Sequence, residues 1–401
     1  MSRAPLPLDE AQARVLALAG LTQAQETPIE AALGCYLAAP LLARRTQPAA
    51  DLSAMDGYAL APGDLAGPWD IVGESAAGHP FAGAVQPGQA VRISTGALVP
   101  EGAGVVLCQE DTAREGNHLT LTGTPPKPEG RHIRRKGLDF RDGDMVLPAG
   151  TRIGAAQLAL AIAAGHGALC VRQRPRLAIL DSGDELIAPG LPCPPDRLPA
   201  SNGAMLGAMV AGLAGEVLRL GPVADDLDAL DAALARAGDA DVIVTSGGAS
   251  VGDHDLIQPA LARWGAQVDF WKVAIRPGKP LLVATRGKHV VIGLPGNPVS
   301  SFVTAHLFLL PLLRAMQGAG DPLPRTAMAH LTEPLGPGAD RREFIRGWWD
   351  GRDVMPRPMR DSSALAAMAA SNCLIEHDAH APAMAAGDAV RIHLIENGGS
   401  A

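Results

Sequence analysis

Residues 241–255 read DVIVTSGGASVGDHD, in which a β-branched run from Val242 to Thr245 leads directly into a loop rich in glycine and acidic residues. A short apolar run bounded by turn residues is typical of a buried strand. Ser246, Gly247 and Gly248 open the loop, and glycine lets a backbone approach a ligand closely. We therefore expect a buried strand whose carboxyl end carries a binding loop.

Outward from this strand, strands and helices alternate along the chain. Strands are expected at 176–180, 216–220, 241–245, 270–275, 281–284 and 289–293, and helices at 203–214, 225–237, 255–264 and 298–316. Such alternation predicts a mainly parallel sheet with helices on both faces. Ligands bind such sheets at the carboxyl ends of the strands.

Three further regions flank this α/β domain, which we assign to residues 175–318. Helices expected at 8–18, 29–42 and 154–164 predict a helical framework domain made of residues 1–47 and 145–174. Short strands between Gly- and Pro-containing turns predict an inserted β-rich domain at 48–144. Strands at 327–331, 342–350 and 389–395 with a helix at 364–370 predict a C-terminal β domain at 319–401, a small barrel or sheet.

Composition limits the classes of function. The chain has 401 residues and a formal net charge of −8, which disfavours broad attraction to nucleic acid or acidic membranes. Its five cysteines contain no CxxC pair, which favours reduced thiols over disulfides or a zinc site. No signal peptide is recognisable, and the apolar stretches at 154–171 and 300–316 are predicted to be buried helices. We expect a cytoplasmic protein with no membrane span and no nucleic-acid partner.

Acidic residues follow the expected strands. Glu185, Asp226, Asp253 and Asp255 lie in these loops, and carboxylate oxygens are ligands that Mg²⁺ prefers. Each loop alone is more often a plain turn between strand and helix, but several such loops at one sheet edge favour a binding site. The loop Pro295-Gly296-Asn297 is expected to bind ligand as well, with Asn297 capping a helix that starts at Pro298. The sequence matches neither a P-loop nor a GxGxxG fingerprint.

Two further segments carry polar side chains suited to a site. Lys272, Arg276 and Lys279 form a basic cluster around a Pro–Gly turn, which is able to point cations at a small oxyanion, although a solvated basic turn is equally compatible. The run DLSAMDGYA at 51–59 exposes Asp56 in a turn, and RISTG at 92–96 contains Thr95. Taken singly, both are more often turn-forming than catalytic.

Several long phrases, in order, resemble those of one family. They are DLSAMDGYAL, VRISTGALVPEGAGVVLCQED, LDSGDEL, VTSGGASVGDHD, IRPGKPL, GLPGNPVSS and RREFIRG. This set is similar to the molybdopterin molybdenumtransferase family, the bacterial relatives of the gephyrin E domain, over nearly the whole chain. The resemblance implies an elongated, multidomain subunit with a molybdopterin-binding α/β domain, in a homodimer whose cleft is lined by both chains.

The resemblance also implies a reaction. Family members take adenylylated molybdopterin from an upstream adenylyltransferase, bind molybdate and release AMP as molybdenum joins the dithiolene, with Mg²⁺. It implies catalytic roles for Asp56, Thr95, Glu185, Asp226, Asp255, Lys272 and Lys279. It implies a molybdate pocket of Arg276, Lys279, Pro280, Arg346 and Ser362, and a metal and nucleotide side of Glu185, Asp226 and Asp255.

The chain departs from the family pattern at a few positions. Leu138 stands where members often carry Glu, Ala200 where they carry Asp or Asn, and Asp361 where Gly is usual, next to the expected molybdate pocket. The alternative functions are a nucleotide pyrophosphatase of the competence-damage type, similar through the α/β domain alone, and a non-catalytic pterin-binding scaffold.

Overall fold

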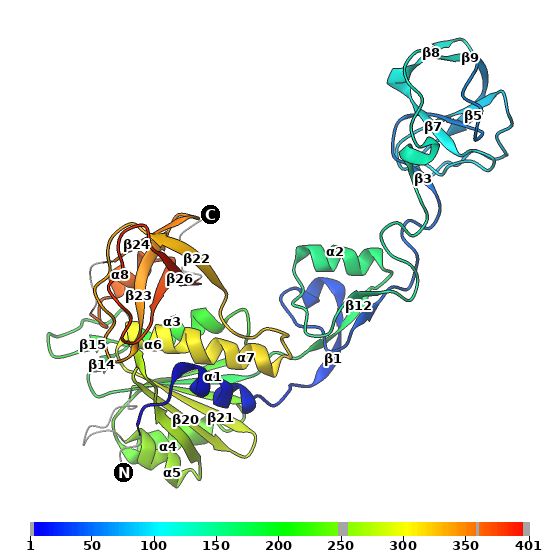
Figure 1. Cartoon of the computed structure of the whole chain (residues 1–401). Helices are drawn as coiled ribbons and strands as arrows, with labels where there is room; N and C mark the ends of the chain where they lie inside the picture. Colours follow the sequence, from blue (N-terminus) through cyan, green and yellow to red (C-terminus); the bar gives the residue numbers. More distant parts are fainter. Residues whose placement is uncertain (1–3, 248–255, 358–360, 396–401) are drawn as a thin grey trace.

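The computed structural model describes residues 4–247, 256–357 and 361–395. Figure 1 shows an elongated, multidomain molecule. The α/β domain and a C-terminal barrel form one large body. The framework domain around α2 (Ala155–Ala163) lies in the middle, and the inserted β-rich domain lies at the far end. The elongated α/β multidomain architecture expected from the sequence is confirmed.

A six-stranded sheet forms the centre of the α/β domain, in the order β16-β13-β17-β21-β20-β18. Four strands pair in parallel, whereas β20 pairs antiparallel with both β21 and β18. Only two residues, Gly287 and Lys288, join β20 to β21, and so short a connection requires antiparallel strands. The bounds are β13 (Leu177–Ser182), β16 (Val217–Val223), β17 (Val242–Ser246), β18 (Gln267–Lys272), β20 (Pro280–Arg286) and β21 (His289–Leu294).

Helices cover both faces of this sheet, as predicted. The side chains of α4 (Leu227–Arg236) and α5 (Ile257–Arg263) fill the core on one face. The other face packs against α3 (Asn202–Val210) and against the segment Pro298–Met316.

The N-terminal helix α1 (Leu8–Ala17) also packs on the α/β domain, although the predicted domain limits placed it in the framework domain. Its apolar stripe Leu8, Ala11 and Val15 is buried in the same core as the segment Pro298–Met316, and the Gln12 side chain donates to the Leu307 carbonyl at 3.0 Å. Burial of this stripe fixes the helix on the α/β domain and corrects the prediction for residues 8–17.

The segment Pro298–Met316 comprises α6 (Pro298–Thr304), a π-helical turn (Ala305–Leu309) and α7 (Leu310–Met316). Pro311 lacks an amide donor, which is consistent with an interrupted helix just before it. By length and composition this is the one helix in the described residues that is able to span a membrane, and 89% of its apolar window is buried inside the fold.

The C-terminal domain is a closed barrel, because β23 pairs with both β24 and β25 in the order β23-β24-β22-β26-β25. The short strand β19 (Ile275–Arg276) leaves the α/β domain and pairs with β23. The sequence did not predict β24 and β25. The bounds are β22 (Thr326–Leu331), β23 (Arg342–Trp349), β24 (Asp353–Pro356), α8 (Leu365–Ala369), β25 (Cys373–His377) and β26 (Ala389–Leu394).

The inserted domain is β-rich as predicted, with the strand order β7-β4-β6-β5-β9-β8. The chain enters it through β3 (Leu52–Ser53) and leaves it through β10 (Ile133–Arg134), and these two strands pair. Its bounds are β4 (Gly57–Leu60), β5 (Trp69–Ser75), β6 (Gln89–Ile93), β7 (Val105–Cys108), β8 (Thr112–Glu115) and β9 (His118–Leu121).

The framework domain is less helical than predicted. Its one α-helix in the described residues is α2, beside the pairs β1–β12 and β2–β11. The helix predicted at 29–42 is wrong, because a 3₁₀ turn ends at Ala32, Gly34 adopts a φ of +78°, and Tyr36 and Leu37 form β-bridges. The bounds are β1 (Ala24–Pro28), β2 (Leu41–Leu42), β11 (Met145–Leu147) and β12 (Ala168–Arg172).

Candidate functional site

Sheet register brings the acidic loops and the basic cluster to the same edge. The carboxyl ends of β13, β17 and β21 are level, since Asp181 pairs with Ser246 and Ser246 pairs with Leu294. Because β18 and β20 are antiparallel and Lys272 pairs with Pro280, the turn between them lies at this edge too. The topology therefore places the expected anion-binding and acidic segments along the same edge of the sheet, with the ends of β17 and β21 between them.

Side-chain contacts join the loops at this edge. Asn202, at the start of α3, donates through Nδ2 to the Ser246 Oγ at 2.8 Å and to the Gly296 carbonyl at 2.7 Å. Gly247 has a φ of +96°, and a Cβ there would lie 2.5 Å from the Ser182 carbonyl oxygen. Glycine is thus required at this position by backbone packing. Gly248 lies outside the described residues.

The basic cluster is held by a tight turn. The Val273 amide donates to the Lys279 carbonyl at 3.0 Å, and Gly278 has a φ of +104°. Lys279 is exposed at the edge, whereas the Lys272 ammonium lies over the Trp271 ring at 4.6 Å from its centroid. A cation over an aromatic ring is stabilised and its direction is fixed.

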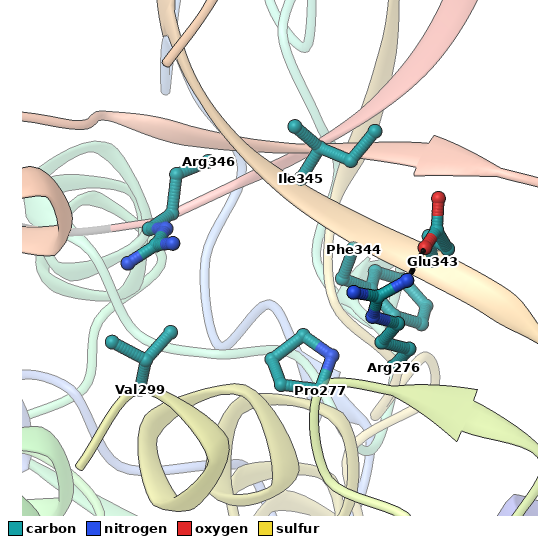
Figure 2. Close-up of a pocket in the computed structure, with 7 residues that line it drawn as sticks. All are labelled: Arg276, Pro277, Val299, Glu343, Phe344, Ile345 and Arg346. Carbon is teal, nitrogen blue, oxygen red and sulfur yellow. Dashed lines mark hydrogen bonds and ion pairs between the residues drawn. The ribbon is translucent and has the colours of Figure 1, made fainter. Parts of the chain in front are cut away.

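A pocket lies where this turn meets the barrel (Figure 2). Figure 2 shows an ion pair between Arg276 and Glu343 at one end of the lining and Arg346 at the other. The lining residues are Arg276, Pro277, Val299, Glu343, Phe344, Ile345 and Arg346. The structure thus brings together two of the predicted molybdate ligands, Arg276 and Arg346, from different domains.

Arg346 is only 4% exposed, and burial lowers the pKa of its guanidinium. It donates to the backbone carbonyls of Ala364 and Asp361, each at 3.0 Å. The carboxylate of Asp361 accepts from the Ser363 Oγ at 2.6 Å, and this bond holds the pKa of Asp361 below its usual value. The extra negative charge noted at position 361 is therefore engaged by the neighbouring serine.

Ser362 is positioned from the α/β domain. Its Oγ accepts from the Asn297 Nδ2 at 3.1 Å, and its carbonyl accepts from the Val299 amide at 3.1 Å. Asn297 occupies the N-cap position of α6, as predicted, but its side chain makes no capping bond. The predicted side-chain cap by Asn297 is therefore wrong, because its amide group contacts Ser362 instead. Pro295, Gly296, Asn297 and Ser362 thus belong to one contact region.

The acidic loops following β13 and β16 are joined. The Asp225 amide donates to the Asp184 Oδ1 at 3.1 Å, and both predicted metal ligands in these loops, Glu185 and Asp226, are exposed. The Oδ2 of Asp226 caps α4 by accepting from the Ala229 amide at 3.0 Å. Asp253 and Asp255 lie outside the described residues, and the described part of the chain contains no group of three His, Cys, Asp or Glu side chains arranged for a metal ion. The metal set stays a prediction.

Asp56 and Thr95 lie together, but not at the sheet edge. The Thr95 amide donates to the Asp56 Oδ1 at 2.6 Å and holds the pKa of Asp56 below its usual value. Both residues belong to the inserted β-rich domain, which Figure 1 shows at the far end of the same chain from β20 and β21. One chain alone therefore does not bring Asp56 and Lys279 together.

Sequence reasoning missed two residues that shape the site. Glu343 faces Arg276 across the domain boundary, and Asn202 joins the Ser246 and Gly296 loops. Glu343 lies within the phrase RREFIRG, and Asn202 lies two residues after Ala200, so the signal present was only their position beside other residues of interest. The pairing itself depends on tertiary structure.

Family models cover almost the whole chain in three consecutive parts. Residues 6–165 match "MoeA N-terminal region (domain I and II)", residues 178–315 match "Probable molybdopterin binding domain", and residues 328–395 match "MoeA C-terminal region (domain IV)". Fold and matches together define a multidomain protein class built around a molybdopterin-binding type of α/β domain.

Curated relatives and solved structures agree with that class. Similar proteins named molybdopterin molybdenumtransferase come from Haemophilus influenzae, 34% identical over 96% of this chain and 98% of that protein, and from Bacillus subtilis, 31% identical over 99% and 96%. A MoeA crystal structure from Pyrococcus horikoshii OT3 matches with a TM-score of 0.84 and 25% identity, covering 98% of this chain and 100% of that one. The chain belongs to the molybdopterin molybdenumtransferase family and is an enzyme of that family. Matches at both ends are not explained by the pyrophosphatase alternative, which rests on the α/β domain alone.

Proposed function

We propose that this chain inserts molybdenum from molybdate into adenylylated molybdopterin and releases AMP in an Mg²⁺-dependent reaction. The observation that carries the proposal is the common sheet edge, along which the basic turn of Arg276 and Lys279 and the loops of Glu185 and Asp226 lie on either side of the Ser246 and Gly296 loops. Molybdate and the nucleotide are both anions, which basic side chains bind. Cleavage of the phosphoanhydride also needs a metal cation, and acidic side chains are needed to hold that cation.

The molybdate side is assigned to Arg276, Lys279, Pro280, Arg346 and Ser362. Arg346 supports this assignment, because its guanidinium is buried and held by two carbonyls beside the pocket. A fixed guanidinium in a partly dry site binds an oxyanion more strongly than one in water. The proposed pterin contacts are the loops of Ser246, Gly247, Gly248, Pro295, Gly296 and Asn297.

The nucleotide side is assigned to Glu185, Asp226 and Asp255, and Lys272 keeps its proposed catalytic role at the end of β18. Exposed carboxylates fit Mg²⁺, which prefers oxygen ligands and usually keeps several waters. The bound ion would offset negative charge at the phosphoanhydride. Asp226 also caps α4, so its Oδ2 holds the end of the loop in place.

We further propose a homodimer in which Asp56 and Thr95 of one chain complete the site of the other. Their distance from the sheet edge in one chain supports this arrangement (Figure 1). The surface of α2 supports it as well: all its residues except Gln157 are apolar, yet only Ala161 is buried and Ile162 is 52% exposed. Exposed apolar helices of this kind mark interaction surfaces. A cytoplasmic location and an upstream adenylyltransferase as supplier belong to the same proposal.

The first test is product release by the purified full-length chain. With Mg²⁺, molybdate and adenylylated molybdopterin, AMP should appear only when molybdate is present. AMP from free dinucleotides and none from adenylylated molybdopterin would establish the pyrophosphatase alternative, and binding of the pterin without AMP would establish the scaffold.

The second test is subunit complementation between two inactive variants, Asp56→Asn and Lys279→Ala. Each alone should lose at least about a hundredfold in AMP release. After subunit exchange, half of the dimers are mixed and each mixed dimer holds one intact site, so about a quarter of wild-type activity should return. No recovery, with mixed dimers shown to form by mass spectrometry, would overturn the site shared between two chains.

A further inference from the structure

We infer that Glu343 is a positioning residue of the oxyanion pocket, which fixes the Arg276 guanidinium and offsets part of its charge. This inference rests on the proposed molybdate pocket and concerns a residue to which no role had been given. Its basis is the ion pair between the Arg276 Nη1 and the Glu343 Oε1 at 3.0 Å (Figure 2).

Backbone register fixes this pair before any side chain is considered. Arg276 lies in β19 and pairs in parallel directly with Glu343 in β23. The contact therefore links the turn of the α/β domain to the wall of the barrel. Because both residues sit in hydrogen-bonded strands, neither backbone is free to move away from the other.

The two partners of this ion pair differ in how deeply their side chains are buried. The Glu343 side chain is 7% exposed, whereas the Arg276 side chain is 52% exposed. A buried carboxylate is costly unless it is paired, so Glu343 holds its partner firmly. The exposed part of the guanidinium remains available on the pocket side, while Nη1 is directed at Glu343.

The surroundings of Glu343 are polar on its other side. His377 in β25 pairs with it in register, and the His377 Nδ1 lies 4.0 Å from the Glu343 Oε2. The backbone of Glu343 is therefore fixed in the barrel by strand pairing, and its carboxylate lies near the His377 ring. The negative charge of this carboxylate repels every anion that enters the pocket. The repulsion weakens the binding of dianions more than that of monoanions, because Coulomb energy scales with ligand charge.

Charge and position are separable by two substitutions. Glu343→Gln keeps an oxygen acceptor for Arg276 but removes the charge, and Glu343→Asp keeps the charge but withdraws it by one methylene. Calorimetric titration of the full-length chain with molybdate, sulfate and the tetrahedral monoanion perrhenate reads both. Glu376→Gln is the matched control, since Glu376 is another barrel carboxylate, 8% exposed, that pairs with Arg342 outside the pocket lining.

Glu343→Gln should lower the Kd of molybdate and sulfate by about fivefold and that of perrhenate by only about twofold. Glu343→Asp should raise all three Kd values by a common factor, about threefold, because the guanidinium is misplaced while the charge is kept. Glu376→Gln should change none of them. Weaker or unchanged dianion binding in Glu343→Gln would overturn the charge role, and unchanged binding in Glu343→Asp would overturn the positioning role.

Arg276→Gln gives a second charge test should Glu343→Gln not fold, since this side chain is half exposed. It leaves the carboxylate without its cation. The Kd of molybdate should therefore rise by about the square of the factor by which the Kd of perrhenate rises. Equal factors would contradict the inference. Failure of the wild-type chain to bind molybdate would instead refute the pocket assignment itself, which distinguishes the two proposals.

Discussion

Two carboxylates with functional assignments lie at opposite ends of the molecule and are held in opposite ways. Asp56 is exposed and accepts from the amide of Thr95, 39 residues away in the same small domain. Glu343 is buried and pairs with Arg276, 67 residues away in another domain. The contrast teaches that the far site depends on contacts within one small domain, whereas the pocket depends on how two domains pack.

The largest expected effect comes from substituting Gly278, in the turn that carries the basic cluster of the pocket. Gly278→Ala must keep a φ of +104° and would place its Cβ 2.5 Å from the Thr304 Cγ2, a fully buried side chain. We expect a loss of about 3 kcal/mol in the unfolding free energy of the α/β domain, measured by denaturant titration. Molybdate binding should weaken as well, because the turn carries Arg276 and Lys279. A loss below about 1 kcal/mol would show that the turn adapts.

A second prediction uses pH to sharpen the same contrast. His306 is buried beside His393, and burial lowers the pKa of His306 to about 3. The folded pKa lies below the unfolded value of about 6.5, so the unfolded state binds more protons as pH falls through this window. Above pH 6.5 this group should not change the free energy of unfolding of the α/β domain and barrel. Between pH 6.5 and pH 5 it should lower that free energy by about 2 kcal/mol.

The check is a pair of denaturation series at pH 7 and pH 5 on the wild-type chain and on His306→Phe. The variant should lack most of that pH-dependent loss. The transition of the β-rich domain, which does not contain His306, should be equal in both proteins. An unchanged pH dependence in His306→Phe would assign the acid sensitivity to other groups.

The smallest expected effect is the matched glycine in the β-rich domain. Gly96 has a φ of +81° and no heavy atom within 4 Å of an added Cβ. Gly96→Ala should therefore cost only the left-handed backbone, about 1 kcal/mol, with the fold of that domain kept. A loss as large as that of Gly278→Ala would show that the far domain is packed as tightly as the pocket, and the contrast would fail.

Much of this arrangement was predictable from the sequence, because its determinants are local. The sheet was predictable from the run Val242 to Thr245 and from the alternation of strands and helices around it. The basic cluster was predictable because its residues flank the Pro–Gly turn at Gly278. The helix predicted at 29–42 is wrong although the spacing of apolar residues there is helical, because Gly34 adopts a left-handed φ of +78° and Pro40 has no amide to donate.

The remaining features depend on contacts between distant segments. The burial of α1 on the α/β domain, the closure of the barrel by β25 and the Arg276–Glu343 pair all join residues from separate domains or strands. A single sequence carries no local signal for such pairings. The roles of the predicted site residues, apart from the geometry described above, stay predictions until the variants are measured.

The entry and exit of the β-rich domain run side by side. β3 pairs with β10, and the Asp51 carboxylate accepts from the Arg135 Nη1 at 2.6 Å and from the Lys136 amide at 2.8 Å. A module attached at two adjoining points is removable, with a short turn closing the gap, while the strands of the framework keep their order. Shortened or exchanged versions of this chain are therefore accessible to engineering and to evolution by a single excision, without rebuilding the body that holds the pocket.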